Sequence, residues 1–141
     1  MNNNTIDCMV RMIALVAIVG CVRSDGMETA PVRGMVTLGG KPYTQGGSVV
    51  FRPESPGKMA TAVIQSDGSF QLSTYARGDG AIIGKHKVMV SPPIPDSTDE
   101  NVDVPITSSI PKKFRSPATS DLICEVKADI TNDIPINLKS E

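Results

Sequence analysis

The chain has 141 residues, of which 40% are hydrophobic and 21% are charged. This composition is typical of one globular domain and excludes an intrinsically disordered chain. Fourteen basic residues against fifteen acidic ones leave no positive surplus, so we expect no nucleic acid partner. Tryptophan is absent and only two Tyr and three Phe occur, which argues against a sugar-binding surface built on aromatic platforms.

The N-terminal segment has the parts of a secretory signal peptide in the expected order. Arg11 precedes an apolar run over residues 12–19, and the small residue Gly20 stands directly before Cys21. The rival interpretation is a transmembrane helix, but the apolar stretch over residues 12–22 is much shorter than the roughly 20 residues that a span needs. The pattern therefore predicts export from the cytoplasm.

The residues around the expected cleavage site, Ile18-Val19-Gly20-Cys21, resemble a bacterial lipobox, in which the cysteine is acylated and becomes the new N-terminus. The resemblance implies a lipoprotein signal peptide over residues 1–20 and lipid attachment at Cys21. It also implies a membrane-anchored location in the bacterial cell envelope, facing the periplasm or the cell exterior. A plain secreted form and an uncleaved short anchor are the alternatives. Residues 21–30 are expected to form a tether to one domain over residues 31–141.

The expected domain shows the period-two alternation of β-strands. Apolar residues alternate with polar ones between clusters of Gly, Pro and Asp, and no apolar stripe with a helical period persists. The pattern predicts seven short strands, whose inward residues are, in chain order, Val32, Val36 and Leu38; Val49 and Phe51; Ala60, Ala62 and Ile64; Phe70, Leu72 and Thr74; Val88 and Val90; Leu122, Cys124 and Val126; Ile134, Ile136 and Leu138.

Turn signals separate these strands. Residues 39–42 (Gly-Gly-Lys-Pro) and 77–80 (Arg-Gly-Asp-Gly) each predict a turn, and Asp67-Gly68 predicts a hairpin with a primed turn. Six of the eleven prolines lie between residues 91 and 122 and exclude central strands there. We expect an edge strand or short turn over residues 102–106 or 110–114. The predicted fold is an all-β, antiparallel β sandwich of about seven strands.

Several of these motifs, in this order, resemble a known domain family. Residues 34–42 and 46–51, followed by the turn at Asp67-Gly68, are similar to carboxypeptidase regulatory-like domains. Residues 78–88 and 110–114 resemble small bacterial lipoproteins that carry such a domain. The resemblance covers residues 31–138 and implies a transthyretin-like (prealbumin-like) β sandwich. In metallocarboxypeptidases this module is an accessory beside the catalytic domain, so the resemblance implies no activity.

Candidate catalytic residues are few. His86 is the only histidine, stands between two lysines and has no nucleophile motif, so we expect an ordinary solvated or strand-edge side chain. Cys124 would be the only cysteine left in the folded part, which excludes an internal disulfide there. Its alternation with Leu122 and Val126 predicts a buried, inert thiol rather than a redox group. We therefore expect no catalytic residues and no cofactor.

Two surface motifs have ordinary explanations. Asp96, Asp99, Glu100 and Asp103 could offer oxygen ligands to calcium, but their spacing does not match an EF-hand, so we expect a solvated acidic loop and no metal site. The tripeptide Arg77-Gly78-Asp79 matches an integrin-binding sequence, although a β-turn explains it better.

The sequence leaves two classes of function open. The first is a non-catalytic, lipid-anchored module that presents its β sandwich to other envelope proteins. The alternative is binding of a small ligand, carbohydrate or calcium through the loops at one end of the sandwich. The lack of an aromatic platform and of a clustered ligand set favours the interaction module over the binding protein.

Overall fold

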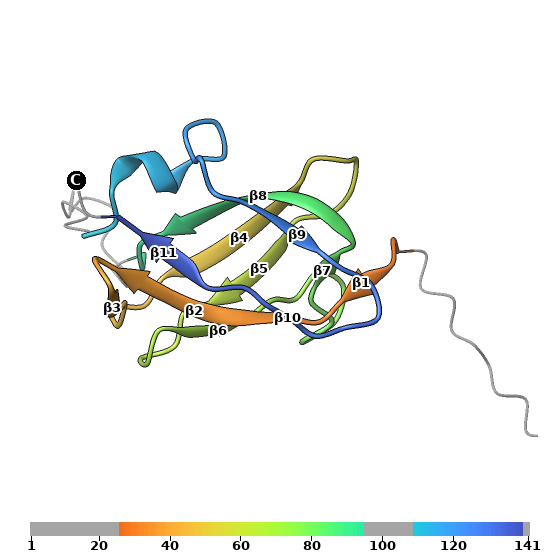
Figure 1. Cartoon of the computed structure of the whole chain (residues 1–141), viewed down its shortest axis with the longest axis horizontal. Coiled ribbons are helices and arrows are strands. Elements are labelled where there is room, and N and C mark those ends of the chain that lie inside the picture. Colours follow the sequence, from red (N-terminus) through yellow and green to blue (C-terminus); the bar gives the residue numbers. More distant parts are fainter. Residues whose placement is uncertain (1–25, 95–108, 140–141) are drawn as a thin grey trace, which may run out of the picture.

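The computed structural model describes residues 26–94 and 109–139 (Figure 1). The described chain is all-β apart from one 3-10 turn, η1 (Lys112–Arg115), and this confirms the predicted fold class. Cys21, the predicted signal peptide and the acidic residues 96–103 lie outside the described residues. Within the described part of the chain, no helix is long and apolar enough to cross a membrane.

Two sheets pack face to face. In the first, β2 (Val32–Leu38) is central and pairs with β3 (Lys41–Pro42), β6 (Ser69–Gln71), β10 (Asn132–Asp133) and β11 (Ile136–Leu138). The second sheet has the order β5 (Ala60–Val63), β4 (Ser48–Pro53), β8 (Gly84–Ser91) and β9 (Ile123–Val126). A small ladder joins β1 (Thr29–Ala30) to β7 (Ala81–Ile82). Figure 1 shows the two layers and the ladder at one end.

The core lies between the two sheets and is built from the alternating residues of each strand. Val49 and Phe51 of β4 are fully buried, and Val88 and Val90 of β8 lie beside them in register. The ring of Phe70, on the opposite sheet, lies 6.3 Å from that of Phe51 between ring centroids. Most of the predicted inward residues are therefore confirmed, because burying one face of each sheet requires this alternation.

The last two strands run in an unexpected direction. β10 and β11 pair with β2 in parallel, whereas every other pairing in the two sheets is antiparallel among the described strands. The chain leaves β9 in one sheet and crosses to the other sheet before β10. The predicted antiparallel sandwich is thus confirmed in most of its pairings. The parallel strands β10 and β11 are exceptions that were not predicted, because alternation reports which face of a strand is buried and not its direction.

The folded domain begins before residue 31. Thr29 and Ala30 form β1, and the Ala30 side chain is buried in the core. The expected tether over residues 21–30 is therefore too long by at least these two residues. Their side chains are small, so the sequence pattern did not distinguish a short strand from a linker.

The turn after β5 differs from the predicted primed turn. Gly68 has a φ of 86°, but Asp67 is not among the residues with positive φ, so the turn lacks the two left-handed residues of type I′. Asp67 instead accepts hydrogen bonds from the amide (2.9 Å) and hydroxyl (2.6 Å) of Ser69. These bonds lower the pKa of Asp67. The segment around η1 forms the expected short turn, with Ile110 and Phe114 buried.

Candidate binding groove

Strands β5 and β6 form a hairpin that is closed at both ends and open in its middle. Thr61 and Ser73 exchange two backbone hydrogen bonds of 3.0 Å, and the Gln65 amide donates to the Ser69 carbonyl at 2.8 Å. Both pairings belong to one register, in which residue 63 would pair with residue 71. No backbone hydrogen bond joins those two residues in the described structure.

We call the missing pair between Val63 and Gln71 the open rung. Backbone groups of both strands face the gap that it leaves. Thr61 directs its backbone groups toward Ser73, so Val63, two residues later on the same strand, directs its own to the same side. Gln71 likewise faces away from β2, because its neighbour Leu72 donates to the Val32 carbonyl. The amide of the Gln65 side chain reaches the Val63 carbonyl at 3.4 Å. The gap therefore presents strand edges that a bound group could pair with.

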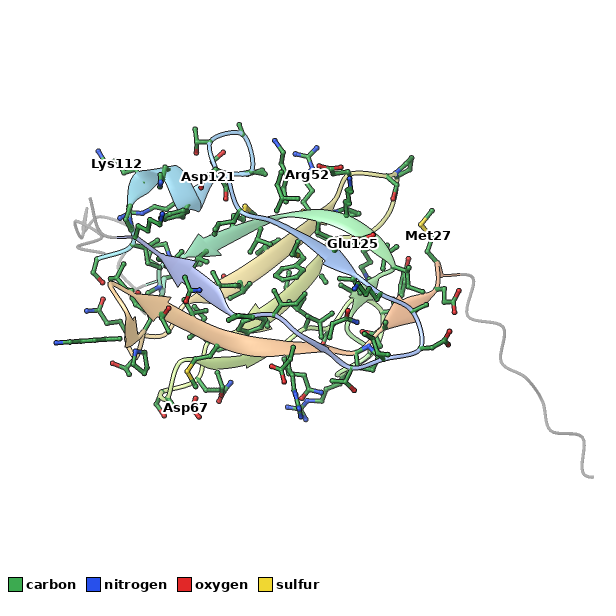
Figure 2. All side chains as sticks on the ribbon, in the orientation of Figure 1. Met27, Arg52, Asp67, Lys112, Asp121 and Glu125 are labelled. Carbon is green, nitrogen blue, oxygen red and sulfur yellow. The ribbon has the colours of Figure 1, made fainter. Side chains whose placement is uncertain are left out.

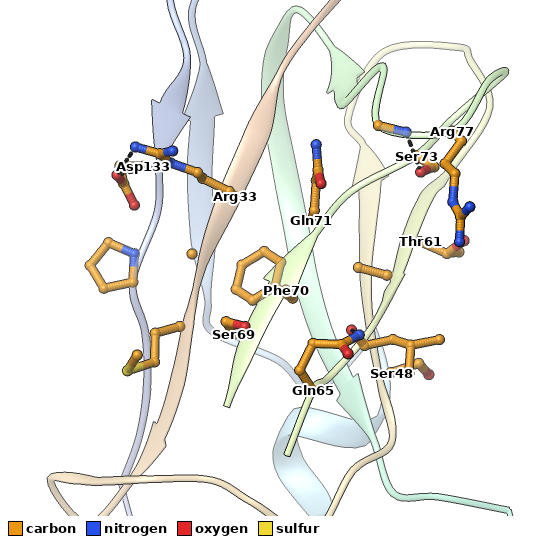
Figure 3. A pocket seen from close by; sticks show the side chains of 16 residues that line it. Arg33, Ser48, Thr61, Gln65, Ser69, Phe70, Gln71, Ser73, Arg77 and Asp133 are labelled. Atoms are coloured by element: carbon orange, nitrogen blue, oxygen red, sulfur yellow. Dashed lines mark hydrogen bonds and ion pairs between the residues drawn. The ribbon is translucent and has the colours of Figure 1, made fainter. Parts of the chain in front are cut away.

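A groove opens around this gap and extends over the outer face of β2. Its volume is about 1360 Å³. Figure 3 shows that its lining comes from both sheets, with Ser48 and Thr61 on one side and Arg33 and Gln71 on the other. The lining combines hydroxyl and amide groups with an apolar floor; its members include Met35, Val63, Gln65, Ser69, Phe70, Ser73 and Pro135.

Two arginines give the groove its charge. Arg33 pairs with Asp133 on the neighbouring strand at 3.3 Å, and both side chains are exposed, so this ion pair adds little stability. Arg77 is exposed and makes no ion pair with another described residue. The groove therefore carries one net positive charge, which favours polar or mildly acidic occupants over cations.

Asp79 holds the loop that carries Arg77. Its carboxylate accepts hydrogen bonds from the backbone amides of Thr74 (2.7 Å), Tyr75 (2.8 Å) and Ala76 (2.9 Å). Partial burial alone would raise the pKa of Asp79, but these three bonds lower it overall. The Arg-Gly-Asp tripeptide is thus a turn whose carboxylate bonds its own loop, as predicted.

His86 lies in the core and not at the surface. Its side chain is 1% exposed, with its ring 5.9 Å from that of Phe51 between centroids. The expectation of a solvated or strand-edge histidine is wrong, because His86 occupies an inward position of β8 between two outward lysines. Nδ1 donates to the Gly84 carbonyl at 3.0 Å, since a carbonyl can only accept, and Nε2 has no hydrogen-bond partner among the residues that the structure describes.

Cys124 lies opposite His86 in the β8–β9 ladder. The two side chains are not charged in the way that a catalytic Cys–His dyad requires. Burial raises the pKa of the Cys124 thiol to about 12. Burial also lowers the pKa of His86. Both shifts favour the neutral thiol and the neutral imidazole, whereas nucleophilic catalysis needs a thiolate beside a charged imidazole. Cys124 is half-buried against the core, so its predicted burial is only partly correct.

The other expected site residues receive no structural test. Cys21 and the acidic loop from Asp96 to Asp103 lie outside the described residues, so lipid attachment at Cys21 and a solvated, metal-free acidic loop stay predictions, with calcium binding by that loop the alternative. Within residues 26–94 and 109–139, no group of three or more His, Cys, Asp or Glu side chains could hold a metal ion. Comparison with protein-family models, curated proteins and solved structures finds no match for this chain.

The sequence pattern did not predict the groove. Its one sequence signal is Val63, an apolar residue at an outward position of a strand where a polar side chain is usual. Val63 is 67% exposed, which is unusual for a large apolar residue of a strand. The open rung beside it depends on how β5 and β6 are held by different sheets, and this cannot be read from either strand alone.

Proposed function

We propose that the protein is a non-catalytic lipoprotein of the bacterial cell envelope that presents its β sandwich as an interaction module. In this proposal Cys21 carries the lipid, and the partner is another envelope protein. The lipobox-like residues 18–21 support the anchor, and the all-β fold is compatible with the resemblance to carboxypeptidase regulatory-like domains. His86 and Cys124 are neighbours across the β8–β9 ladder, and burial shifts the pKa of each toward its neutral form. These neutral side chains support a function without catalysis.

The open rung between Val63 and Gln71 is the observation that carries the choice of partner. Exposed strand edges with unpaired ladder positions bind extended polypeptide segments through main-chain hydrogen bonds. The hydroxyl and amide side chains around the gap suit peptide groups. Phe70, the one aromatic residue in the lining, is buried and offers no platform on which a sugar ring could stack. A polypeptide therefore fits the groove better than a carbohydrate.

Site-specific photocrosslinking tests this assignment in cells that make the full chain. A photoreactive phenylalanine analogue replaces Val63 in one variant and Ile123 in a matched control. The two side chains are 67% and 60% exposed and lie on β5 and β9, the opposite edges of one sheet. We expect a discrete protein adduct at position 63 that is at least several times stronger than any adduct at position 123.

Two results would contradict the groove as the interaction site. Equal adducts at the two positions would indicate non-specific proximity at the envelope. A complete lack of adducts at position 63, with the variant folded and normally abundant, would show that no protein occupies the groove. A second measurement uses the partner that the crosslinking identifies. Val63→Asp in the groove should reduce the amount of this partner that copurifies with the chain, whereas Ile123→Asp should not.

A further inference from the structure

Three large apolar side chains are exposed at the end of the sandwich where the described chain begins. Met27, Met59 and Tyr75 have exposed fractions of 48%, 49% and 42%. They come from the chain before β1, the loop before β5 and the loop after β6. Figure 2 shows Met27 at this end and Lys112 at the opposite end. We call Met27, Lys58, Met59 and Tyr75 the N-terminal patch.

Contacts between the segments hold the N-terminal patch together. The Met27 amide donates a hydrogen bond to the Tyr75 hydroxyl at 3.2 Å. The Lys58 ammonium lies 5.5 Å from the centroid of the Tyr75 ring. A Cβ on Gly57 would lie 3.2 Å from the Met27 sulfur, so the loop before β5 packs against Met27. The patch is therefore one surface and not three separate exposed residues.

Met59 belongs to this surface through its neighbour in the chain. It directly follows Lys58, whose ammonium lies over the Tyr75 ring, and directly precedes β5. Contiguous exposed apolar surface of this kind marks a site that meets another apolar phase or partner. The N-terminal patch therefore extends across both loops at this end.

The residue types of the N-terminal patch match a membrane–water interface. Tyrosine has an apolar ring with a polar tip and is enriched at the headgroup level of bilayers. Lysine can lay its apolar stem along such a surface while its ammonium stays in water. Methionine side chains are flexible and adapt to an irregular apolar phase. Lys58 is the one charged member of the patch and the other three members are uncharged, so the contact with lipid is mainly apolar.

The few residues between Cys21 and Gly26 limit the distance between the N-terminal patch and a lipid anchor at Cys21. Four residues separate Cys21 from Gly26, and the five extended residue steps between them reach at most about 18 Å. The opposite end of the sandwich is further away, because β8 begins two residues after β7 and carries the chain about 25 Å along its eight residues. The lipid surface thus faces the end of the domain that bears the patch.

We propose that the N-terminal patch docks on the lipid surface in which Cys21 is anchored. This inference rests on the proposed lipid attachment. Docking orients the sandwich with β1 toward the membrane and the far ends of β2 and β8 away from it. Such an orientation leaves the groove along β5 and β6 at the side of the molecule, open to a partner.

Tryptophan fluorescence can test the docking because the natural chain contains no Trp. The full chain, produced in bacteria and placed in phosphatidylcholine vesicles, carries Tyr75→Trp in one variant and Ile94→Trp in the control. Ile94 is exposed and follows the far end of β8. Acyl chains that carry bromine near the headgroup should quench the fluorescence at position 75 at least threefold more than at position 94. Met59→Trp provides a second probe should Tyr75→Trp disturb folding.

The outcomes separate the docking from the anchor. Vesicle association with strong quenching at positions 75 and 59, and weak quenching at position 94, supports the docking. Association with equal quenching at all three positions overturns the docking while the anchor stands. If the chain does not associate with vesicles, and its N-terminal peptide carries no acyl chain, both the docking and the proposed lipid attachment are wrong.

Discussion

A buried imidazole should make the stability of this domain depend on pH. Burial lowers the pKa of His86 below 6.5, although its bond to Gly84 and the nearby Glu54 oppose the shift. The unfolded chain, with an ordinary pKa of about 6.5, then binds the proton more readily than the folded chain. The stabilising contribution of the neutral imidazole is therefore fully present above about pH 6.5 and is lost as the pH falls through the lowered folded value.

Denaturant unfolding of the chain from residue 22 onward, at pH 7.5 and pH 5, measures this loss. The free energy of unfolding should be lower at pH 5, and His86→Phe should remove most of the difference. At pH 7.5 the variant should differ by only about 1–2 kcal/mol, because the lost bond to Gly84 is offset by apolar packing beside Phe51. An equal pH dependence in the two proteins would contradict this account.

The thiol of Cys124 should react slowly in the native state. Its pKa of about 12 leaves almost no thiolate at neutral pH, and the side chain packs against the core. Cys124→Val should change the free energy of unfolding by less than about 1.5 kcal/mol, since the volumes are similar. Thiol labelling followed by mass measurement, before and after denaturation, checks this. Rapid native labelling would reopen the redox interpretation.

At the level of the elements, Gly34 controls how the last strands join the first sheet. A Cβ at this position would overlap the backbone carbonyl oxygen of Ile134 and lie 2.8 Å from the ring of Phe70. The Ile134 amide donates to the Arg33 carbonyl at 2.8 Å, so the chain between β10 and β11 cannot move away without breaking the ladder. The close approach of the two backbones therefore requires glycine here.

Gly34→Ala should lower the free energy of unfolding by at least about 2 kcal/mol, because overpacking against backbone cannot be relieved by a side-chain rotation. Gly40→Ala is the control: no atom of the described residues lies within 4 Å of its added Cβ, so only the strain of its positive φ, about 1–2 kcal/mol, applies. Denaturant unfolding compares the two variants. A Gly34 variant as stable as the Gly40 variant would show that the parallel strands are loosely held.

The strands show what the sequence could predict and what it could not. Alternation identified the buried faces of β4, β5 and β8, because burying one face of a sheet imposes a period of two. The same alternation includes His86, but its two lysine neighbours suggested a solvated position. The parallel direction of β10 and β11 and the open rung at Val63 escaped prediction, since both depend on which distant strands become neighbours.

At the scale of the whole molecule, one end of the sandwich and one of its sides have different roles in our proposal. The chain enters at β1, beside the N-terminal patch, while β11 ends at the opposite end (Figure 1). The groove lies along the β5–β6 side between these ends. An anchor at Cys21 would thus hold the domain against the membrane and leave the groove accessible to an extended segment of a neighbouring envelope protein.

Lipid attachment at Cys21 is the claim on which this arrangement depends. Two or more acyl chains hold a protein stably on a membrane, whereas one chain gives only marginal binding. Mass spectrometry of the N-terminal peptide of the mature protein, purified from bacterial membranes, tests it most directly. We predict a peptide that begins at Cys21 and carries the mass of two or three acyl chains. An unmodified Cys21, or a mature N-terminus at another residue, would contradict the account.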